Sequence, residues 1–179
     1  MRHKYVTRAL VLARAPVGET SASLALLTRD MGLVRARAQG VRCSGARLAS
    51  PLITLAESEL MLVRGAEGWR VTGAQLQQAW HTSLPQVARV RATRVLGLAL
   101  RLVPPETREP APFEIMAQAL ADFANYEGDF FEAIECQAVL KLLRVLGLDA
   151  GDIPDLAHLA QDRKSVVMRI NRGIALSGL

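Results

Sequence analysis

Short stretches of apolar and β-branched residues, each ending in a turn-forming segment, dominate the first eighty residues of the chain. Such stretches predict β-strands, and we expect five of them, at residues 6–13, 23–29, 33–39, 52–64 and 69–76. The third strand alternates strictly, which places Arg35 and Arg37 on one face and valine and alanine side chains on the other. The fourth strand changes register between Leu55 and Leu60, which predicts a bulge or a bend.

Five strands joined by short turns, with one longer loop at residues 40–51, fit a small closed barrel of the OB type. Closure would remove the exposed strand edges that a flat sheet of this size leaves open. An open five-stranded sheet is the alternative that the pattern allows. In either arrangement we expect Trp69 to lie in the core.

From residue 83 onward the apolar period becomes helical. Residues 85–103 predict a buried helix that ends before Pro104 and Pro105, and residues 113–126 predict a second helix. The sequence therefore predicts an α+β protein. A five-stranded OB-type barrel forms an N-terminal domain at residues 1–80, and an all-α helical domain follows at residues 81–179.

A third helix is expected between Asp129, which would cap its start with Glu132 completing a capping box, and Gly147, which would end it. Asp162 is expected to cap a last helix that reaches nearly to the C-terminus. The third helix carries an apolar stripe that we assign to the core, formed by Phe131, Ile134, Ala138, Leu142 and Val145.

Basic residues concentrate at the N-terminus of the chain. The net charge is +5, yet residues 1–50 hold nine basic and two acidic residues, whereas the rest hold 13 basic and 15 acidic residues. A surface that only serves solubility would intersperse both signs. The asymmetry therefore favours a nucleic-acid partner for the N-terminal half.

A membrane or secreted location is not expected. No window reaches the apolar length that spans a bilayer, and Arg8 and Arg14 interrupt the N-terminal apolar stretch. Cys43 and Cys136 are far apart and match no metal-ligand spacing. We expect a cytoplasmic, nucleoid-associated protein with reduced thiols, no metal and no cofactor.

Catalytic residues are not expected either. The three histidines, His3, His81 and His158, are scattered, and none accompanies a nucleophile in a recognisable arrangement. No phosphate-binding glycine-rich loop with its lysine is present. Glu132 and Glu135 are spaced as a pair on one helix, but we expect both to face solvent. These patterns predict a binding protein rather than an enzyme.

The basic side chains of the predicted barrel are the candidate binding residues. Arg35 and Arg37 lie two strand rises apart, about 6.7 Å, an interval at which guanidinium groups can follow the phosphates of an extended strand. The candidate DNA-binding residues are Lys4, Arg8, Arg29, Arg35, Arg37, Arg42 and Arg47. Because aromatic residues make up only 4% of the chain, we expect strong salt dependence and little sequence preference.

A second basic group lies on the first predicted helix. Arg91, Arg94 and Arg101 fall within an arc of about 80° at 100° per residue. They could extend the DNA contact or line the junction of the two domains, and both interpretations stay open.

Four segments, in order along the chain, resemble the RecO family of recombination mediators. They are Gly18-Glu19-Thr20, then Leu26-Leu27-Thr28-Arg29 with Gly32, then Ala36-Arg37-Ala38-Gln39-Gly40-Val41-Arg42 with Ser44, Arg47 and Leu48, and finally Phe131-Glu132 with Leu142-Leu143-Arg144-Val145-Leu146-Gly147. The resemblance covers most of the chain.

This resemblance implies an N-terminal OB domain and a helical C-terminal domain. It also implies binding to single-stranded and duplex DNA, annealing of complementary strands, and help in loading recombinase onto DNA coated with single-strand DNA-binding protein (SSB). The implied partners are RecR and the acidic, apolar C-terminal tail of SSB, whose carboxylate would meet Lys141 or Arg144 on the helical domain.

Two features depart from the family pattern. Cys43, Gly45 and Ala46 stand in a loop where relatives carry more basic residues, which puts the DNA affinity of this loop in doubt. Many relatives also hold a zinc ion through four cysteines, and two cysteines cannot form that site, so a shorter, zinc-free member is expected. The alternative from another functional class is an RNA- or ribosome-binding OB-fold assembly factor, which composition alone does not separate from a DNA repair protein.

Overall fold

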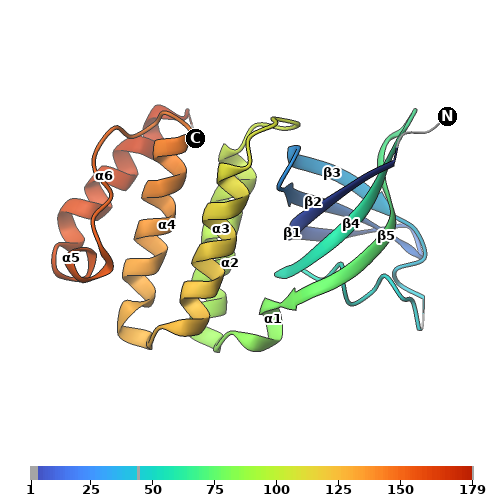
Figure 1. Ribbon diagram of the computed structural model, residues 1–179, viewed down its shortest axis with the longest axis horizontal. Helices are drawn as coiled ribbons and strands as arrows, with labels where there is room; N and C mark the ends of the chain where they lie inside the picture. Colours follow the sequence, from blue (N-terminus) through green and yellow to red (C-terminus); the bar gives the residue numbers. More distant parts are fainter. Residues whose placement is uncertain (1–3, 44, 179) are drawn as a thin grey trace. The chain divides into compact units, whose positions relative to one another are not determined.

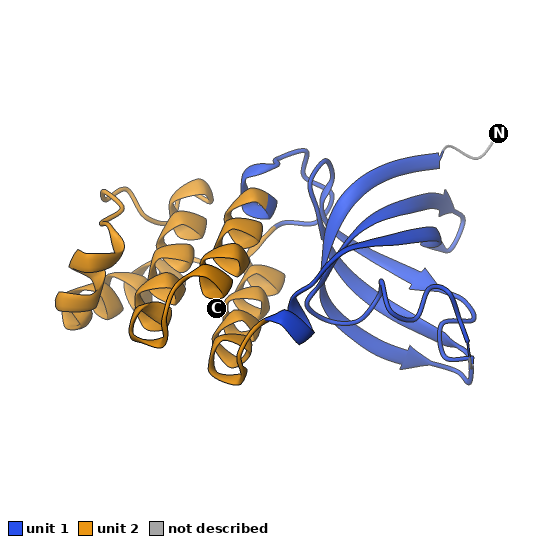
Figure 2. Cartoon of the chain, turned by 60° about the horizontal axis from the view of Figure 1, so that its bottom comes forward, with its two compact units in different colours: residues 1–83, 104–113 blue, residues 84–103, 114–179 orange. Residues whose placement is uncertain are grey.

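The computed structural model describes residues 4–43 and 45–178; His3 and Ser44, used in the sequence analysis, lie outside this range. The chain divides into a barrel unit, residues 1–83 and 104–113, and a helical unit, residues 84–103 and 114–179 (Figure 2). A β-barrel followed by helices confirms the predicted α+β fold class.

The five predicted strands form a closed barrel in the order β1-β2-β3-β5-β4 (Figure 1). Their bounds are β1 (Lys4–Val17), β2 (Ser21–Thr28), β3 (Gly32–Ala38), β4 (Ala56–Gly65) and β5 (Gly68–Ala79). Neighbouring strands run antiparallel, except that β3 and β5 are parallel. The closed order decides the question between barrel and open sheet in favour of the OB-type barrel.

The first strand closes the barrel because it pairs on both of its edges. Residues 4–10 of β1 pair with β4, and residues 9–17 pair with β2. The register shifts between Val11 and Ala13, where the pairing with β2 is irregular. A bulge of this kind bends a strand, which a small barrel needs in order to close.

Alternate residues of every strand fill the barrel interior. On β3, Val34, Ala36 and Ala38 are buried while Arg35 and Arg37 are exposed, as the alternation predicted. Trp69 is buried at 8% exposure and belongs to the same core, which confirms its predicted place.

The fourth strand begins later than the sequence predicted, at Ala56 rather than at residue 52. Leu55 has a positive φ of 68°, a left-handed conformation that a leucine rarely adopts and that interrupts a strand. The predicted bulge is present, because the β4–β5 register shifts between Glu57 and Ser58.

The loop between β3 and β4 is held by one arginine of β1. The guanidinium of Arg14 donates hydrogen bonds to the carbonyl oxygens of Val41, Ala49 and Leu52 at 3.3–3.4 Å. Val41 and Leu52 are buried in the barrel core. The loop therefore packs as part of the barrel unit.

The helical elements follow the predicted order. They are α1 (Trp80–Ser83), α2 (Gln86–Leu102), α3 (Ala111–Asn125), the 3-10 turn η1 (Gly128–Phe130), α4 (Phe131–Val145), α5 (Leu156–Gln161) and α6 (Arg163–Leu176). In the helical unit, Ala133 and Leu140 of α4 form a core cluster with Leu159 and Val166. No helix in the described part of the chain is both long and apolar enough to cross a membrane.

Two predictions about α4 are wrong. Asp129 does not cap the helix, because it lies inside η1 and the helix begins at Phe131 without a side-chain cap. Val145 is 42% exposed rather than core, because it is the last residue of the helix, although the rest of its apolar stripe is buried.

The predicted end of α4 and the predicted cap of α6 are confirmed, whereas α3 begins at Ala111, two residues before the predicted start. Gly147 has a φ of +73° just after α4, and its N–H donates to the Arg144 carbonyl at 3.0 Å. Asp162 caps α6, with its carboxylate accepting from the Ser165 N–H at 3.4 Å.

Candidate nucleic-acid interface

A single register row of the barrel brings basic side chains from three strands together. Ser23 of β2 pairs with Arg37, Arg37 with Arg70 of β5, Arg70 with Val63 of β4, and Val63 with Lys4 of β1. Neighbouring strands lie about 4.8 Å apart, so these positions follow one another around the barrel. We call Lys4, Arg37 and Arg70 the basic row.

The two arginines of the row lie on the outer face. Trp69 and Val71 on either side of Arg70 are core residues, as are Ala36 and Ala38 on either side of Arg37. Because strand side chains alternate, both arginines point away from the core. Both also line one surface cavity of 310 Å³, together with Gln39.

Little internal charge compensates this face. The Arg37 guanidinium lies 3.8 Å from the Glu67 carboxylate, and both side chains are largely exposed, so this contact is weak. Arg35 is exposed on the same face of β3, two residues before Arg37, and pairs in register with Ala25 of β2. The arrangement leaves guanidinium donors open to an external anion.

Arg70 was not predicted as a binding residue from the sequence. Its signal is present in the alternation of β5, where buried Trp69 and Val71 flank it. The link to Arg37 depends on the parallel pairing of β3 with β5, which joins residues far apart in the chain.

Arg8 has an internal partner. Its guanidinium is ion-paired with Glu57, a carboxylate that is 4% exposed and that also accepts from the Trp80 indole N–H at 3.3 Å. The guanidinium also lies over the Phe113 ring, 5.7 Å from its centroid. These contacts give Arg8 a structural role in the barrel unit, whereas its DNA contact stays a prediction.

The loop candidates differ in their contacts. Arg42 donates to the Gly18 carbonyl at 2.7 Å and thereby joins the loop to the turn between β1 and β2. Arg47 is exposed in the same loop, and Arg29 is exposed just after β2. None of these residues belongs to the register row, so the structure does not bring all seven predicted residues into one line.

Of the three candidate arginines of α2, Arg91 has internal partners. Arg91 is ion-paired within the helical unit, at 2.5 Å from Glu135 and 3.8 Å from Glu132 of α4. Glu132 also pairs with Arg163 of α6 at 2.5 Å. The prediction that both glutamates only face solvent is therefore wrong, because they link three helices. Arg94 lines a cavity together with Glu132 and Glu135, and Arg101 is exposed. The DNA contact of these α2 arginines stays a prediction.

The cavity beside Glu135 also contains Cys136. Burial, with a smaller effect of Glu132 and Glu135, raises the pKa of the Cys136 thiol to about 11. Cys43 is exposed in the barrel loop. Within the described residues, no group of three or more His, Cys, Asp or Glu side chains is arranged to hold a metal ion.

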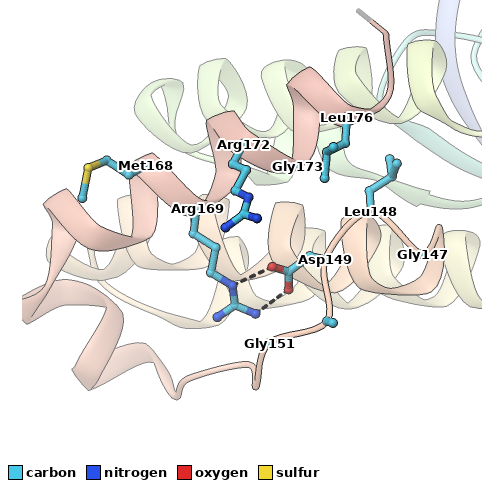
Figure 3. A pocket seen from close by; sticks show the side chains of 10 residues that line it. Gly147, Leu148, Asp149, Gly151, Met168, Arg169, Arg172, Gly173 and Leu176 are labelled. Atoms are coloured by element: carbon cyan, nitrogen blue, oxygen red, sulfur yellow. Dashed lines mark hydrogen bonds and ion pairs between the residues drawn. The ribbon is translucent and has the colours of Figure 1, made fainter.

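The helical unit also has a cavity of 620 Å³, between the segment after α4 and the last helix (Figure 3). Leu148, Met168 and Leu176 supply apolar surface, and Arg172 projects into it. Arg169 is bound to Asp149 by two hydrogen bonds, one of them 2.8 Å from Nε to Oδ1.

The Arg169 hydrogen bond is the main reason that the pKa of Asp149 lies below its usual value, and the charge of Arg144 adds a smaller effect. The charge of Arg144 therefore acts on the Asp149 carboxylate, which lines this cavity. Lys141, the other residue predicted to meet a partner's carboxylate, donates instead to Gln137 Oε1 at 2.7 Å.

Comparison with known proteins gives one consistent family. Residues 1–80 match the family described as Recombination protein O N terminal. A protein named DNA repair protein RecO from Dehalococcoides mccartyi strain 195 is 33% identical over 126 residues, which cover 69% of this chain and 49% of that protein. The RecO of a second Dehalococcoides mccartyi strain is 29% identical over 173 residues, covering 94% of this chain and 65% of the relative.

A RecO from Gloeobacter violaceus is 32% identical over 93 residues, covering 52% of this chain and 36% of the relative. The chain thus spans roughly half to two thirds of the length of the first two relatives, 49% and 65%. The N-terminal family match, the RecO relatives and the closed five-stranded barrel agree with one another. The chain therefore belongs to the RecO family.

Proposed function

We propose that the barrel unit binds the sugar-phosphate chain of DNA along the basic row and Arg35, and that the protein acts in DNA repair and recombination without catalysing a reaction itself. The observation that carries this proposal is the in-register pair of Arg37 and Arg70 on the outer face, where the exposed Glu67 carboxylate lies 3.8 Å from Arg37. Adjacent guanidinium groups repel each other unless an anion lies between or over them. A phosphate chain supplies such anions at regular intervals.

In the proposed complex, this face contacts the charged phosphates rather than the edges of the bases. Guanidinium groups can bind phosphates of any sequence, so the row would give affinity without base specificity. A binder of this kind can hold single-stranded and duplex DNA and can bring complementary strands together. Annealing of complementary strands, including strands coated with SSB, and help in loading a recombinase are therefore the proposed activities, with RecR as a partner.

The proposed docking site of the SSB tail is the cavity around Arg172. An acidic tail with apolar side chains needs a cation for its terminal carboxylate and an apolar surface beside it. Arg172 and the apolar group of Leu148, Met168 and Leu176 offer both, whereas Arg169 is engaged by Asp149. The effect of the Arg144 charge on Asp149 supports Arg144 as a cation that attracts the tail to this site, and Lys141 is the weaker candidate because its ammonium group already donates a hydrogen bond to Gln137.

The experiment that tests the proposed activity is the annealing of two complementary oligonucleotides, bare and coated with SSB. We expect the protein to accelerate annealing of both, and we expect Arg35→Glu with Arg37→Glu to lose this effect while keeping its fold. Tight binding to single-stranded RNA with no annealing of DNA would instead favour an RNA-binding assembly factor and would contradict the proposal.

The tail site has its own test. Arg172→Ala should weaken binding of a fluorescent peptide with an acidic, apolar C-terminus, and amidation of the peptide's terminal carboxylate should weaken it to a similar extent. Equal affinity of both peptides for the wild-type protein would contradict this site.

A further inference from the structure

A cavity of 440 Å³ opens in the barrel unit beside the basic row, and the proposed function does not use it. Tyr5, Asp30, Arg64, Trp69, Glu106 and Arg108 line this cavity. Two aromatic side chains, two cations and two carboxylates meet there, so the lining is close to neutral in sum. A neutral aromatic ligand with polar edges suits such a lining better than a bare phosphate does.

Trp69 is the fixed wall of this cavity. The Arg64 guanidinium lies over the Trp69 ring, 5.3 Å from the ring centroid. The indole N–H of Trp69 donates to Glu106 Oε1 at 3.0 Å. Glu106 also accepts from Arg64 at 2.9 Å, and its own backbone N–H donates to the Leu33 carbonyl at 3.0 Å. Because its face and its N–H are occupied, the buried Trp69 is not available for stacking.

Tyr5 is the free aromatic surface. Its ring meets Trp69 edge to face, with centroids 5.2 Å apart and planes at 79°. The residue is nevertheless 42% exposed. Packing against the fixed indole orients the phenol ring, so a flat ligand could stack on it at a small cost in side-chain entropy.

The polar groups around Tyr5 match the edges of a nucleobase. Asp30 uses Oδ2 to accept from the Thr7 hydroxyl at 2.7 Å, which orients its carboxylate at the cavity. Arg108 is exposed at the rim, where it could donate to a base edge or to a flanking phosphate. Base edges carry hydrogen-bond donors and acceptors, which can pair with a carboxylate and a guanidinium group of this kind.

This cavity continues the basic row. Trp69 lines both it and the cavity of Arg37 and Arg70, so the two cavities adjoin at this residue. We propose that, when a strand lies on the basic row, the Tyr5 cavity accepts one of its nucleobases, stacked on the phenol ring. This inference rests on the proposed function and adds a contact to bases where the row contacts only phosphates.

The test compares two single strands of equal length and charge: an oligo-dT and the same backbone with every base removed. The proteins are wild type, Tyr5→Phe, Tyr5→Leu and Val6→Ala. Leucine keeps apolar volume against Trp69 but cannot stack, and Val6 is an exposed residue of the same strand on the opposite face. Thermal unfolding of each variant checks that the barrel is intact.

We expect wild type, Tyr5→Phe and Val6→Ala to bind oligo-dT about 10-fold more tightly than the abasic strand. Tyr5→Leu should bind the abasic strand as wild type does and should lose most of the preference for oligo-dT. A Tyr5→Leu protein that keeps the full preference, or that loses affinity equally for both strands, would overturn the inference.

The failure of this inference is distinguishable from failure of the proposed function. Arg37→Ala with Arg70→Ala should weaken binding to both strands alike, because both carry the same phosphates. If this variant weakens binding while Tyr5→Leu has no selective effect, the phosphate contact of the basic row is supported and the base cavity is contradicted.

Discussion

Arg37 and Arg70 occupy paired positions of the parallel β3–β5 ladder, and both side chains leave the barrel on its outer face. Two positive charges held in register in this way repel each other, whereas most cross-strand pairs attract. Their repulsion is a cost that the free protein bears and that a bound phosphate chain would remove.

The first prediction concerns this repulsion. Arg70→Gln should raise the free energy of unfolding of the DNA-free protein by about 0.5 kcal/mol at low salt, because it removes one of the two like charges. The difference should disappear near 1 M salt, where the Debye length falls to about 3 Å. Urea unfolding at both salt concentrations measures it. A loss of stability at low salt would show that Arg70 has a stabilising partner instead.

The second prediction separates a structural arginine from the binding arginines. Arg8→Ala should lower the free energy of unfolding by about 2 kcal/mol, because it leaves the buried Glu57 carboxylate without its cation. Arg35→Ala should change stability by less than about 0.5 kcal/mol, because Arg35 is an exposed position. Thermal and urea unfolding of both variants provide the comparison, and equal stability of the two would contradict the role given to Arg8.

Arg35 and Arg37 show what the sequence could predict. A strand with one buried face must alternate, so the pattern of residues 33–39 alone predicts that both arginines lie outside the barrel. The same reasoning predicted the five strands, the bulge between Leu55 and Leu60 and the glycine that ends α4. These features depend on local periodicity and on backbone conformations that few residues tolerate.

Arg70, Arg8 and Arg91 show what the sequence could not predict. Each owes its role to a partner distant in the chain: Arg37 across the parallel ladder, Glu57 on another strand, and Glu135 on another helix. Only tertiary pairing decides whether a given arginine meets an internal carboxylate or an external anion. Periodicity alone carries no such information.

The third prediction follows from the ion pair of the helical unit. The hydrogen bond from Arg169 lowers the pKa of Asp149 in the folded protein. Asp149→Asn should therefore cost about 1 to 2 kcal/mol of unfolding free energy near pH 7. The stability from a lowered folded-state pKa is fully present above the unfolded pKa, about 3.9 for aspartate. It is lost as the pH falls from that value through the folded-state pKa, so the difference from wild type should shrink below about pH 4.

Urea unfolding of both proteins between pH 7 and pH 3 measures this effect. Asp152→Asn is the matched control, because Asp152 contacts Arg169 through its backbone carbonyl, at 2.7 Å from Nη1. A stability difference between Asp149→Asn and wild type that does not change with pH would contradict the role assigned to the Asp149 carboxylate.

The fourth prediction concerns the two thiols. Burial raises the pKa of Cys136 to about 11, so only about one thousandth of it is thiolate at pH 8. Cys43 is exposed, so iodoacetamide should label it first. Mass spectrometry of tryptic peptides over time measures both rates. Labelling of Cys136 as fast as that of Cys43 in the folded protein would mean that the α4 cavity opens readily.

The central claim is that the outer face of β3 and β5 binds the phosphates of DNA. The salt dependence of DNA affinity tests this claim most directly. For single strands, the logarithm of the association constant falls with the logarithm of salt concentration by about 0.7 per phosphate contact. Arg37→Ala with Arg70→Ala should therefore weaken binding to oligo-dT and make the slope shallower by about 1.4.

Lys164→Ala, which removes an exposed charge from α6, is the control and should leave the slope unchanged. A double variant of Arg37 and Arg70 with the wild-type slope and affinity would contradict the account.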